Sequence, residues 1–248
     1  MNRRYMLIGP VVLTALWFAV THLGLIDRLL LPTPENVVRK LVYLAATGEV
    51  LKDFAWTTAR WLSGWALGIA IGVPLGLVMG ASARVYASLE IVVDFFRSIP
   101  VMAMFPLFLV FLGIGDMSKI AISAWTTMLY VLINTLYGVR HGSEARRMVA
   151  RVYRATWWQT FTKVIFPEAL PHIFIGMRLS VSMSLVLAVA AEMVMGTTYG
   201  LGKRIFDAGL TYSLSEMYSF IIVAGALGYI SNKVFVAVES RVVHWKAA

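Results

Sequence analysis

The feature that most constrains this chain is a series of long apolar stretches with too few charges for the interior of a soluble protein. Of its 248 residues, 59% are hydrophobic and only 14% are charged, and the mean hydropathy is +0.76. This composition is typical of a chain whose helices lie in lipid. We therefore predict an all-α integral membrane protein that forms a single transmembrane domain over residues 1–248.

Six transmembrane helices are predicted, with both chain ends on the cytoplasmic side. The first, residues 5–25, follows Arg3 and Arg4 but lacks a convincing cleavage site, so we interpret it as a retained helix rather than a signal peptide. The other five are expected within residues 58–240. Their approximate bounds are 58–79, 86–112, 120–138, 172–195 and 218–238.

The formal charge of +9 does not indicate a nucleic-acid partner, because the basic residues lie in short loops beside apolar stretches. They alternate with the spans as the topology requires, with Lys203 and Arg204 as exceptions on the outer side. The chain has no cysteine, and its four histidines include no pair at helical spacing. It also has no P-loop of the form GxxxxGK[ST], so we expect no metal or cofactor on this chain.

The second apolar stretch contains five glycines at intervals of four, which places them on one helix face. They are Gly64, Gly68, Gly72, Gly76 and Gly80. A row of small residues lets another backbone approach closely, so we predict a close helix crossing and no chemistry here.

The third apolar stretch is interrupted by Arg97-Ser98-Ile99-Pro100 and again by Pro106. Irregular backbone at membrane depth is tolerated only inside protein or against a water-filled cavity, so this broken helix is a candidate part of a translocation path. The candidate residues are Arg97, Ser98, Pro100 and Pro106. Arg97 is equally a candidate ion-pair partner for Asp94 or Glu90, and the two roles are compatible.

Glu192 lies near the outer end of the fifth stretch. An acid in or near a membrane span is costly unless it is paired or hydrated, so Glu192 is a second candidate for the path. The alternative is that it reaches the outer interface and pairs with Lys203 or Arg204.

The one long polar interruption is Arg140 to Pro171. Its excess of basic residues predicts the cytoplasmic side of the membrane. Thr156 and Gln159 have the spacing of a capping box, so a short helix should begin near Trp157 and end at Pro167. Its aromatic face indicates either a protein partner or an interfacial helix among lipid head groups.

Two runs in this loop, Ala155-Thr156-Trp157-Trp158-Gln159 and Val164 to Pro171, resemble the second half of the EAA loop of ATP-binding-cassette importer permeases. The nitrate, sulfonate and taurine branch is the most similar, and the resemblance extends from Leu31 to about Gly202. It includes a block of the form RxIPxxAxxPLxxxxxGIGxxSK, an AEM…GLG signature at Ala191 to Gly202, and an LP(S/T)P entry at Leu31 to Pro34 with a helix start at Thr33 or Pro34. The block is matched at Arg97, Ile99, Pro100, Ala103, Pro106, Leu107, Gly113 to Gly115, Ser118 and Lys119.

The first half of the loop departs from the family pattern. Met148, Val149 and Ala150 stand at the Glu-Ala-Ala positions, and Arg154 stands at the glycine position. Glu144-Ala145 resembles the opening of the motif but lies four residues too early. One hypothesis is that this chain pairs with a second permease that keeps the full motif.

The resemblance implies a permease of the bacterial inner membrane that works with a second permease copy or paralogue, two ATPase subunits and a soluble substrate-binding protein. ATP and magnesium would be bound by the ATPase subunits. The substrate class it implies is a small oxyanion or organosulfonate, for which Arg97 could supply bidentate donors. The residues implied in ATPase coupling are Arg154, Ala155, Thr156, Trp157, Trp158, Gln159, Phe161 and Pro167.

Two other classes of function fit the sequence less well. A membrane-embedded enzyme would need clustered acids or histidines, but the acidic pair Glu90 and Asp94 has no nucleophile nearby. A stand-alone carrier or channel would have no need of a capped amphipathic helix between its fourth and fifth spans, and we find no inverted repeat.

Overall fold

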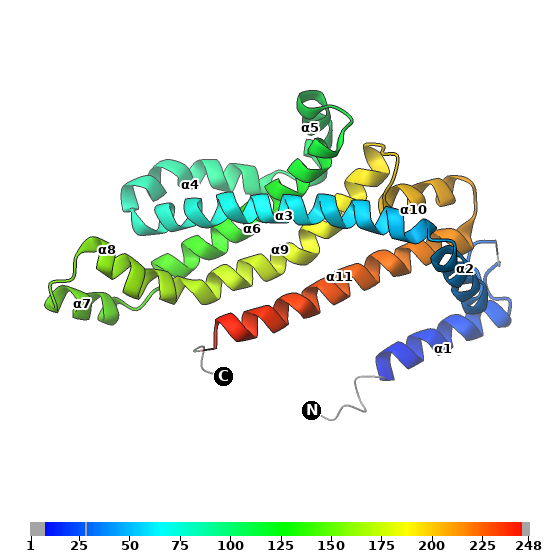
Figure 1. Ribbon diagram of the computed structural model, residues 1–248, viewed down its shortest axis with the longest axis horizontal. Coiled ribbons are helices and arrows are strands. Elements are labelled where there is room, and N and C mark those ends of the chain that lie inside the picture. Colours follow the sequence, from blue (N-terminus) through cyan, green and yellow to red (C-terminus); the bar gives the residue numbers. More distant parts are fainter. Residues whose placement is uncertain (1–7, 28, 245–248) are drawn as a thin grey trace. The chain divides into compact units, whose positions relative to one another are not determined.

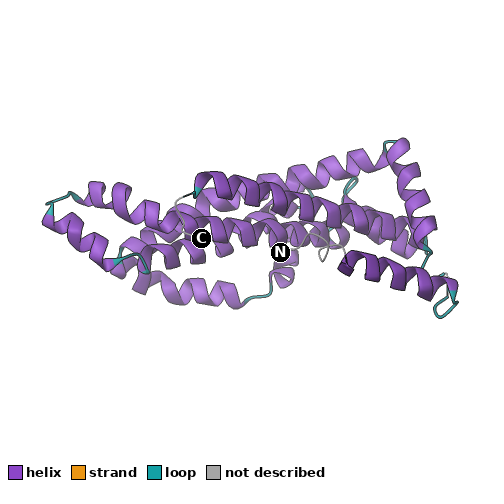
Figure 2. Cartoon of the chain, turned by 90° about the horizontal axis from the view of Figure 1, so that it is seen from below, coloured by secondary structure: helices purple, strands orange, loops and turns teal. Residues whose placement is uncertain are grey.

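The computed structural model describes residues 8–27 and 29–244, and this part of the chain contains only helices and connecting loops (Figures 1 and 2). The predicted all-α class is therefore confirmed. The elements are α1 (Ile8–His22), α2 (Pro34–Ala46), α3 (Glu49–Ala81), α4 (Ala83–Ser98), η2 (Val101–Met104), α5 (Phe105–Leu112), α6 (Asp116–Arg140), α7 (Glu144–Val152), α8 (Trp157–Thr160), η3 (Phe161–Ile165), α9 (Phe166–Val194), α10 (Leu201–Leu210) and α11 (Leu214–Val242).

Four helical segments are long and apolar enough to cross a membrane: α3, α6, α11 and the continuous segment Trp157–Val194. A fifth candidate is the broken pair formed by α4 with η2 and α5, whose arms are bent by 92°. The apolar helix α1 has 15 residues and is shorter than these. The six-span count thus stays a prediction. The described residues do not include the predicted start of the first span at residue 5, the flanking Arg3 and Arg4, or the basic residue Lys246 near the C-terminus.

The chain divides into two compact units, which we describe separately. The first joins Met1–Thr57 to Thr198–Ala226, and the second joins Thr58–Thr197 to Leu227–Ala248. In the first unit, α2 begins where the sequence predicts. Thr33 is the N-cap, its hydroxyl accepts from the Asn36 N–H at 3.4 Å, and Pro34 occupies the first turn.

Helix α3 begins at Glu49 and not near residue 58, because the polar residues before the apolar stretch have tertiary partners. Asp53 is buried; its Oδ1 accepts from the Gly200 N–H at 2.8 Å and its Oδ2 lies 2.8 Å from Arg204 Nε. Burial alone would lower the pKa of the Arg204 guanidinium, but the hydrogen bond and charge of Asp53 raise it. The acid therefore fixes the start of α10 against the first turns of α3.

In the second unit, α3 crosses α6 at very short range. A Cβ added at Gly68 would lie 2.5 Å from the Thr127 Cβ, and one added at Gly76 would lie 2.6 Å from the Thr135 Cβ. The other glycines of the row also meet α6 in this way. The predicted helix crossing is confirmed, and only glycine fits on this face of α3.

Helix α9 packs along another face of α6, where Gly176 allows a close approach to Asn134. Small hydroxyls on α9 also bind α3: the indole of Trp61 donates to Ser184 Oγ at 2.9 Å, and the indole of Trp65 donates to Ser180 Oγ at 3.0 Å. These bonds satisfy the tryptophan N–H groups within an apolar interior. Helices α3, α6 and α9 therefore form the packed centre of the second unit.

Candidate functional site

The capped helix that the sequence predicts is present. The Thr156 hydroxyl accepts from the Gln159 N–H at 3.3 Å, and the Gln159 side-chain oxygen accepts from the Thr156 N–H at 2.9 Å. Two backbone donors that no helical carbonyl could reach are thereby satisfied. The capping box and the start of α8 at Trp157 are confirmed.

Three aromatic residues form an exposed cluster on this first turn. The rings of Trp157 and Phe161 stack with centroids 5.3 Å apart, and Trp158 stacks on Phe161 at 6.0 Å. The two indoles are 65% and 64% exposed. Trp157 and Phe161 also border a cavity of about 640 Å³ at the turn between α3 and α4, near Ser82 and Arg84. The cluster presents apolar surface that nothing within the described chain covers completely.

The predicted stop at Pro167 is wrong, because the helix continues through Pro167 and Pro171 to Val194. The turn before Pro167 is the π-helical segment η3, in which the Phe166 N–H bonds to the Phe161 carbonyl five residues back. A π-turn is wider than an α-turn and gives the pyrrolidine ring room where it would otherwise crowd the preceding carbonyl. The short helix that begins at Trp157 and the fifth predicted span are therefore one continuous helix.

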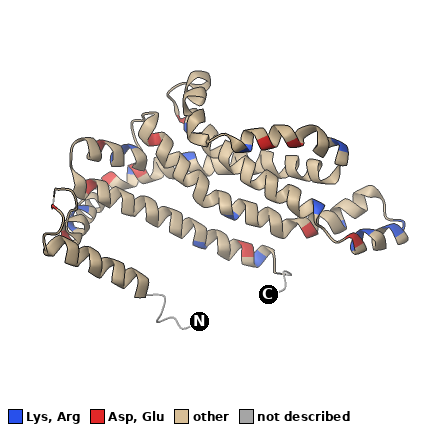
Figure 3. Cartoon of the chain, turned by 180° about the vertical axis from the view of Figure 1, so that it is seen from behind, with Lys and Arg blue, Asp and Glu red and all other residues tan. Residues whose placement is uncertain are grey.

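Helix α7 contains Met148 and Val149, which depart from the family pattern, and Arg154 lies two residues beyond its end. The helix carries three arginines and one glutamate (Figure 3) and is capped by Ser143. It ends in a Schellman motif, in which the Ala155 N–H bonds to the Ala150 carbonyl and the Arg154 N–H to the Arg151 carbonyl. Arg154 has φ +52°, the left-handed conformation that favours glycine. The arginine thus adopts a backbone conformation suited to the glycine of the family pattern.

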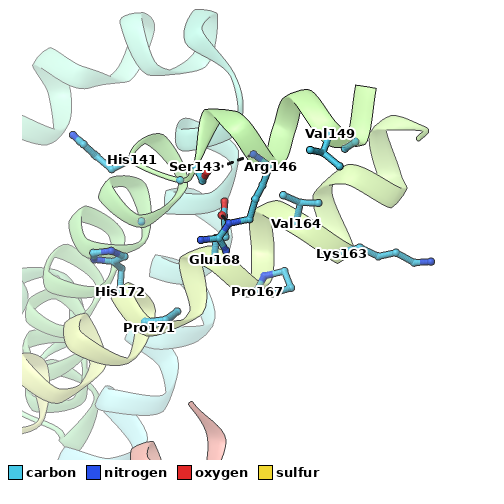
Figure 4. Close-up of a pocket in the computed structure, with 13 residues that line it drawn as sticks. His141, Ser143, Arg146, Val149, Lys163, Val164, Pro167, Glu168, Pro171 and His172 are labelled. Carbon is cyan, nitrogen blue, oxygen red and sulfur yellow. Dashed lines mark hydrogen bonds and ion pairs between the residues drawn. The ribbon is translucent and has the colours of Figure 1, made fainter. Parts of the chain in front are cut away.

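An ion pair joins α7 to the start of α9. Arg146 Nε lies 2.8 Å from Glu168 Oε1, and Figure 4 shows the two side chains pointing toward each other. Within residues 8–27 and 29–244, no donor makes a hydrogen bond of good geometry to either carboxylate oxygen, although both oxygens are buried. Arg147 donates to the Val139 carbonyl at the end of α6. The Arg146–Glu168 pair borders a cavity of about 860 Å³ that also reaches His172.

The predicted break in the third stretch is confirmed, with α4 ending at Ser98 and Pro100 preceding η2. Pro106 lies in the first turn of α5, where its missing N–H removes no helical bond. Arg97 pairs with Asp94 at 3.3 Å, but both side chains are 57% exposed, so the pair is not buried.

Glu192 is the predicted path residue with the most constrained surroundings. Its side chain is 1% exposed, and its Oε1 accepts from Arg60 Nη1 at 2.6 Å. Lys203 pairs with Asp207 and Arg204 pairs with Asp53, and the alternative pairing of either with Glu192 stays a prediction.

Arg60 binds through each of its guanidinium nitrogens. Besides the bond to Glu192, Nε donates to Asp116 Oδ1 at 2.7 Å and Nη2 donates to Thr197 Oγ1 at 2.9 Å. Lys119 is also buried, and its Nζ donates to the Gly115 carbonyl at 3.1 Å. We call Arg60, Asp116, Lys119 and Glu192 the charge network; it contains two cations and two anions.

The sequence interpretation did not identify Arg60 or Asp116. The available signal was a single arginine at the edge of the second apolar stretch. An arginine that faces other helices at that depth indicates a buried acidic partner.

The comparison with known families decides the class of protein. Residues 72–243 match the family described as binding-protein-dependent transport system inner membrane component, which is well over half of the chain. The chain belongs to this family. The predicted resemblance to importer permeases is thereby confirmed.

The permease is 32% identical over 241 residues to a Bacillus subtilis (strain 168) protein with the provisional name aliphatic sulfonates transport permease protein SsuC, covering 97% of this chain and 87% of that protein. It is 28% identical over 239 residues to the taurine transport system permease protein TauC of Escherichia coli (strain K12), covering 94% and 86%. The permease is therefore a membrane-embedded transport subunit and not an enzyme.

A solved structure shows the same fold. The permease matches a chain of the MetNI methionine ABC transporter in an inward-facing conformation with a TM-score of 0.67, at 22% identity, over 77% of the permease and 94% of that chain. In importers of this class a separate subunit hydrolyses ATP. This agrees with the absence of a P-loop from the sequence.

Proposed function

We propose that this permease forms half of the translocation path of an importer for small oxyanions, with nitrate, taurine and other organosulfonates as the leading substrates. The names of its relatives support this substrate class. Arg97, Ser98, Pro100, Pro106 and Glu192 are its proposed path residues. ATP and magnesium are bound by the ATPase subunits, and a soluble binding protein delivers the substrate from outside.

The proposed ATPase contact is the segment from Arg154 to Gln159 with Phe161 and Pro167. Aromatic residues are frequent anchors of protein interfaces, and the exposed Trp157 and Trp158 stack on the half-buried Phe161 to form such a cluster. The basic α7 beside them supports the cytoplasmic side for this loop and for both chain ends.

One observation carries the proposal: the helix that begins at Trp157 ends at Val194, two residues beyond Glu192. At 1.5 Å per residue, these 38 residues span about 57 Å. A movement of the ATPase at Trp157 would therefore reach the charge network through a single helix. This continuity supports a lever mechanism for switching the path.

The test is purification of the natively expressed permease in mild detergent, with mass spectrometry of the proteins that accompany it. We expect an ATPase subunit with the wild-type protein and its loss after Trp157→Ala combined with Trp158→Ala. Tyr153→Ala is the matched control, because Tyr153 is also an exposed aromatic residue of this loop but lies outside the cluster. Recovery of the ATPase with the double variant would contradict the proposed contact.

The same sample shows whether the importer contains one kind of permease chain or two. A second, different permease would support the heterodimer suggested by Met148 and Arg154. Two copies of this chain and no other permease would exclude it.

A further inference from the structure

The charge network has the composition of an anion-binding site in which a carboxylate of the protein itself occupies the position of the bound anion. Arg60 lies on α3, Asp116 and Lys119 on α6, and Glu192 on α9, so three helices of the second unit contribute to it. Two cations and two anions balance at this position. Buried charges are stable only while they are balanced, so the loss of either acid would leave a net positive charge.

The two acids differ in how firmly they are held. Glu192 is 1% exposed within the packed end of α9, whereas the Asp116 side chain is 43% exposed. Asp116 follows Gly113 and Gly115, and a Cβ added at either glycine would meet no atom within 4 Å. Asp116 therefore lies at the open edge of the network, beside backbone that has room to move.

The remaining bonds of Arg60 do not depend on Asp116. Glu192 and Thr197 bind Nη1 and Nη2 from the other side, so the guanidinium stays oriented if the bond from Nε to Asp116 breaks. A guanidinium in a fixed orientation is well suited to carboxylate, sulfonate and similar oxyanions.

The network also adjoins the proposed path. Ala191, the neighbour of Glu192, packs in a buried cluster with Phe105 and Ile122. Phe105 begins α5, directly before Pro106 of the broken stretch. The same end of α9 therefore contacts the broken stretch and carries the acid that orients Arg60.

We propose that Arg60 is an anion-binding residue of the translocation path and that Asp116 occupies its place until a substrate oxyanion displaces it. This inference rests on the proposed transport of small oxyanions and names the group that receives them. Exchange of one anionic group for another keeps the charges around Arg60 balanced, so a solute without an anionic group gains nothing from displacing Asp116.

The test measures anion binding to the purified permease without any ATPase, by thermal unfolding in detergent with increasing sulfate or methanesulfonate at constant ionic strength. Asp116→Asn removes the competing charge and should lower the half-saturating anion concentration by about fivefold or more relative to wild type. Asp116→Ser serves the same purpose if the asparagine variant does not fold. Adding Arg60→Lys to either variant should abolish saturation, because lysine keeps the charge but lacks the planar guanidinium.

Two control variants make the result specific. Asp207→Asn breaks the exposed ion pair with Lys203 and should respond as wild type does. Asp94→Asn releases Arg97 from its partner and tests the other candidate arginine. Saturable binding that appears in the Asp94 variant and not in the Asp116 variants would overturn the proposal, as would saturation that survives Arg60→Lys. An equal response in all variants would identify a general salt effect and would also overturn it.

Failure of the Arg60 site and failure of the proposed transport function give different results. Anion binding at Arg60 without substrate uptake by the assembled importer would count against the transport proposal alone. Uptake of taurine or nitrate that is unchanged in Asp116→Asn and in Arg60→Lys would count against the Arg60 site alone.

Discussion

Arg60 on α3 and Glu192 on α9 lie 132 residues apart in the chain, yet their Nη1 and Oε1 atoms are 2.6 Å apart and both side chains are almost completely buried. This pair joins the first half of α3 to the C-terminal end of α9, and both helices also meet α6. The Arg60–Asp116 bond extends the contact to the first turn of α6.

Removing one member of this pair should destabilise the permease strongly. Glu192→Gln leaves the Arg60 charge with fewer partners in an apolar interior, and we expect a loss of about 3–5 kcal/mol in the free energy of unfolding. Thermal unfolding in detergent measures the change. Asp207→Asn breaks an exposed pair and should cost no more than about 1 kcal/mol. Equal losses in both variants would show that the buried pair has no special role.

Filling the glycine row should also destabilise the second unit. Gly68→Ala places a methyl group 2.5 Å from the Ala124 carbonyl oxygen, and overpacking of this kind costs about 1–3 kcal/mol. Gly225→Ala in α11 is the control, because its new Cβ meets nothing within 4 Å and should instead stabilise the helix by about 0.5–1 kcal/mol. A harmless Gly68→Ala in the same unfolding assay would argue against the close crossing.

Arg154→Gly should stabilise the coupling loop, since the residue at this position has φ +52°. We expect a gain of about 1 kcal/mol in the free energy of unfolding. Arg151→Gly removes the same charge within α7 and should lower stability by a similar amount. Loss of stability in Arg154→Gly would mean that the arginine side chain has contacts worth more than the backbone strain.

The capping box should protect the first turn of α8. Thr156→Ala removes the acceptor of the Gln159 N–H and should cost about 1 kcal/mol, seen as faster hydrogen exchange at that amide. Thr162→Ala is the control, because its hydroxyl bonds to the Trp158 carbonyl and caps nothing. Unchanged exchange at Gln159 in the Thr156 variant would contradict the role of the cap.

Local signals in the sequence predicted the features that depend on neighbouring residues. Thr33 and Thr156 both cap helices, the glycine row marks a helix crossing, and Pro100 follows the end of α4. Each follows from short-range stereochemistry, which does not depend on how distant parts of the chain meet.

Two features could not be predicted in this way. Pro167 ends a helix by every local rule, but a π-turn before it gives the ring room and lets α9 continue. Arg60 finds Asp116 and Glu192 only after α3, α6 and α9 have packed, and no spacing in the sequence connects the three residues. The same is true of Asp53 and Arg204, whose contact extends α3 toward its N-terminus.

The central claim is that the segment from Trp157 to Val194, which runs from the proposed ATPase contact to the end of α9, moves as one rigid helix. Because the chain has no cysteine, Lys163→Cys and Leu179→Cys give two unique labelling sites on either side of Pro167 and Pro171. These positions are 16 residues apart (179 minus 163), which corresponds to about 24 Å along a helix. The decisive measurement is the distance between spin labels at these sites in the assembled transporter, with and without ATP. We predict a single narrow distribution near the helical distance that ATP does not change; a second population or an ATP-dependent shift would show a hinge at the prolines and contradict the lever.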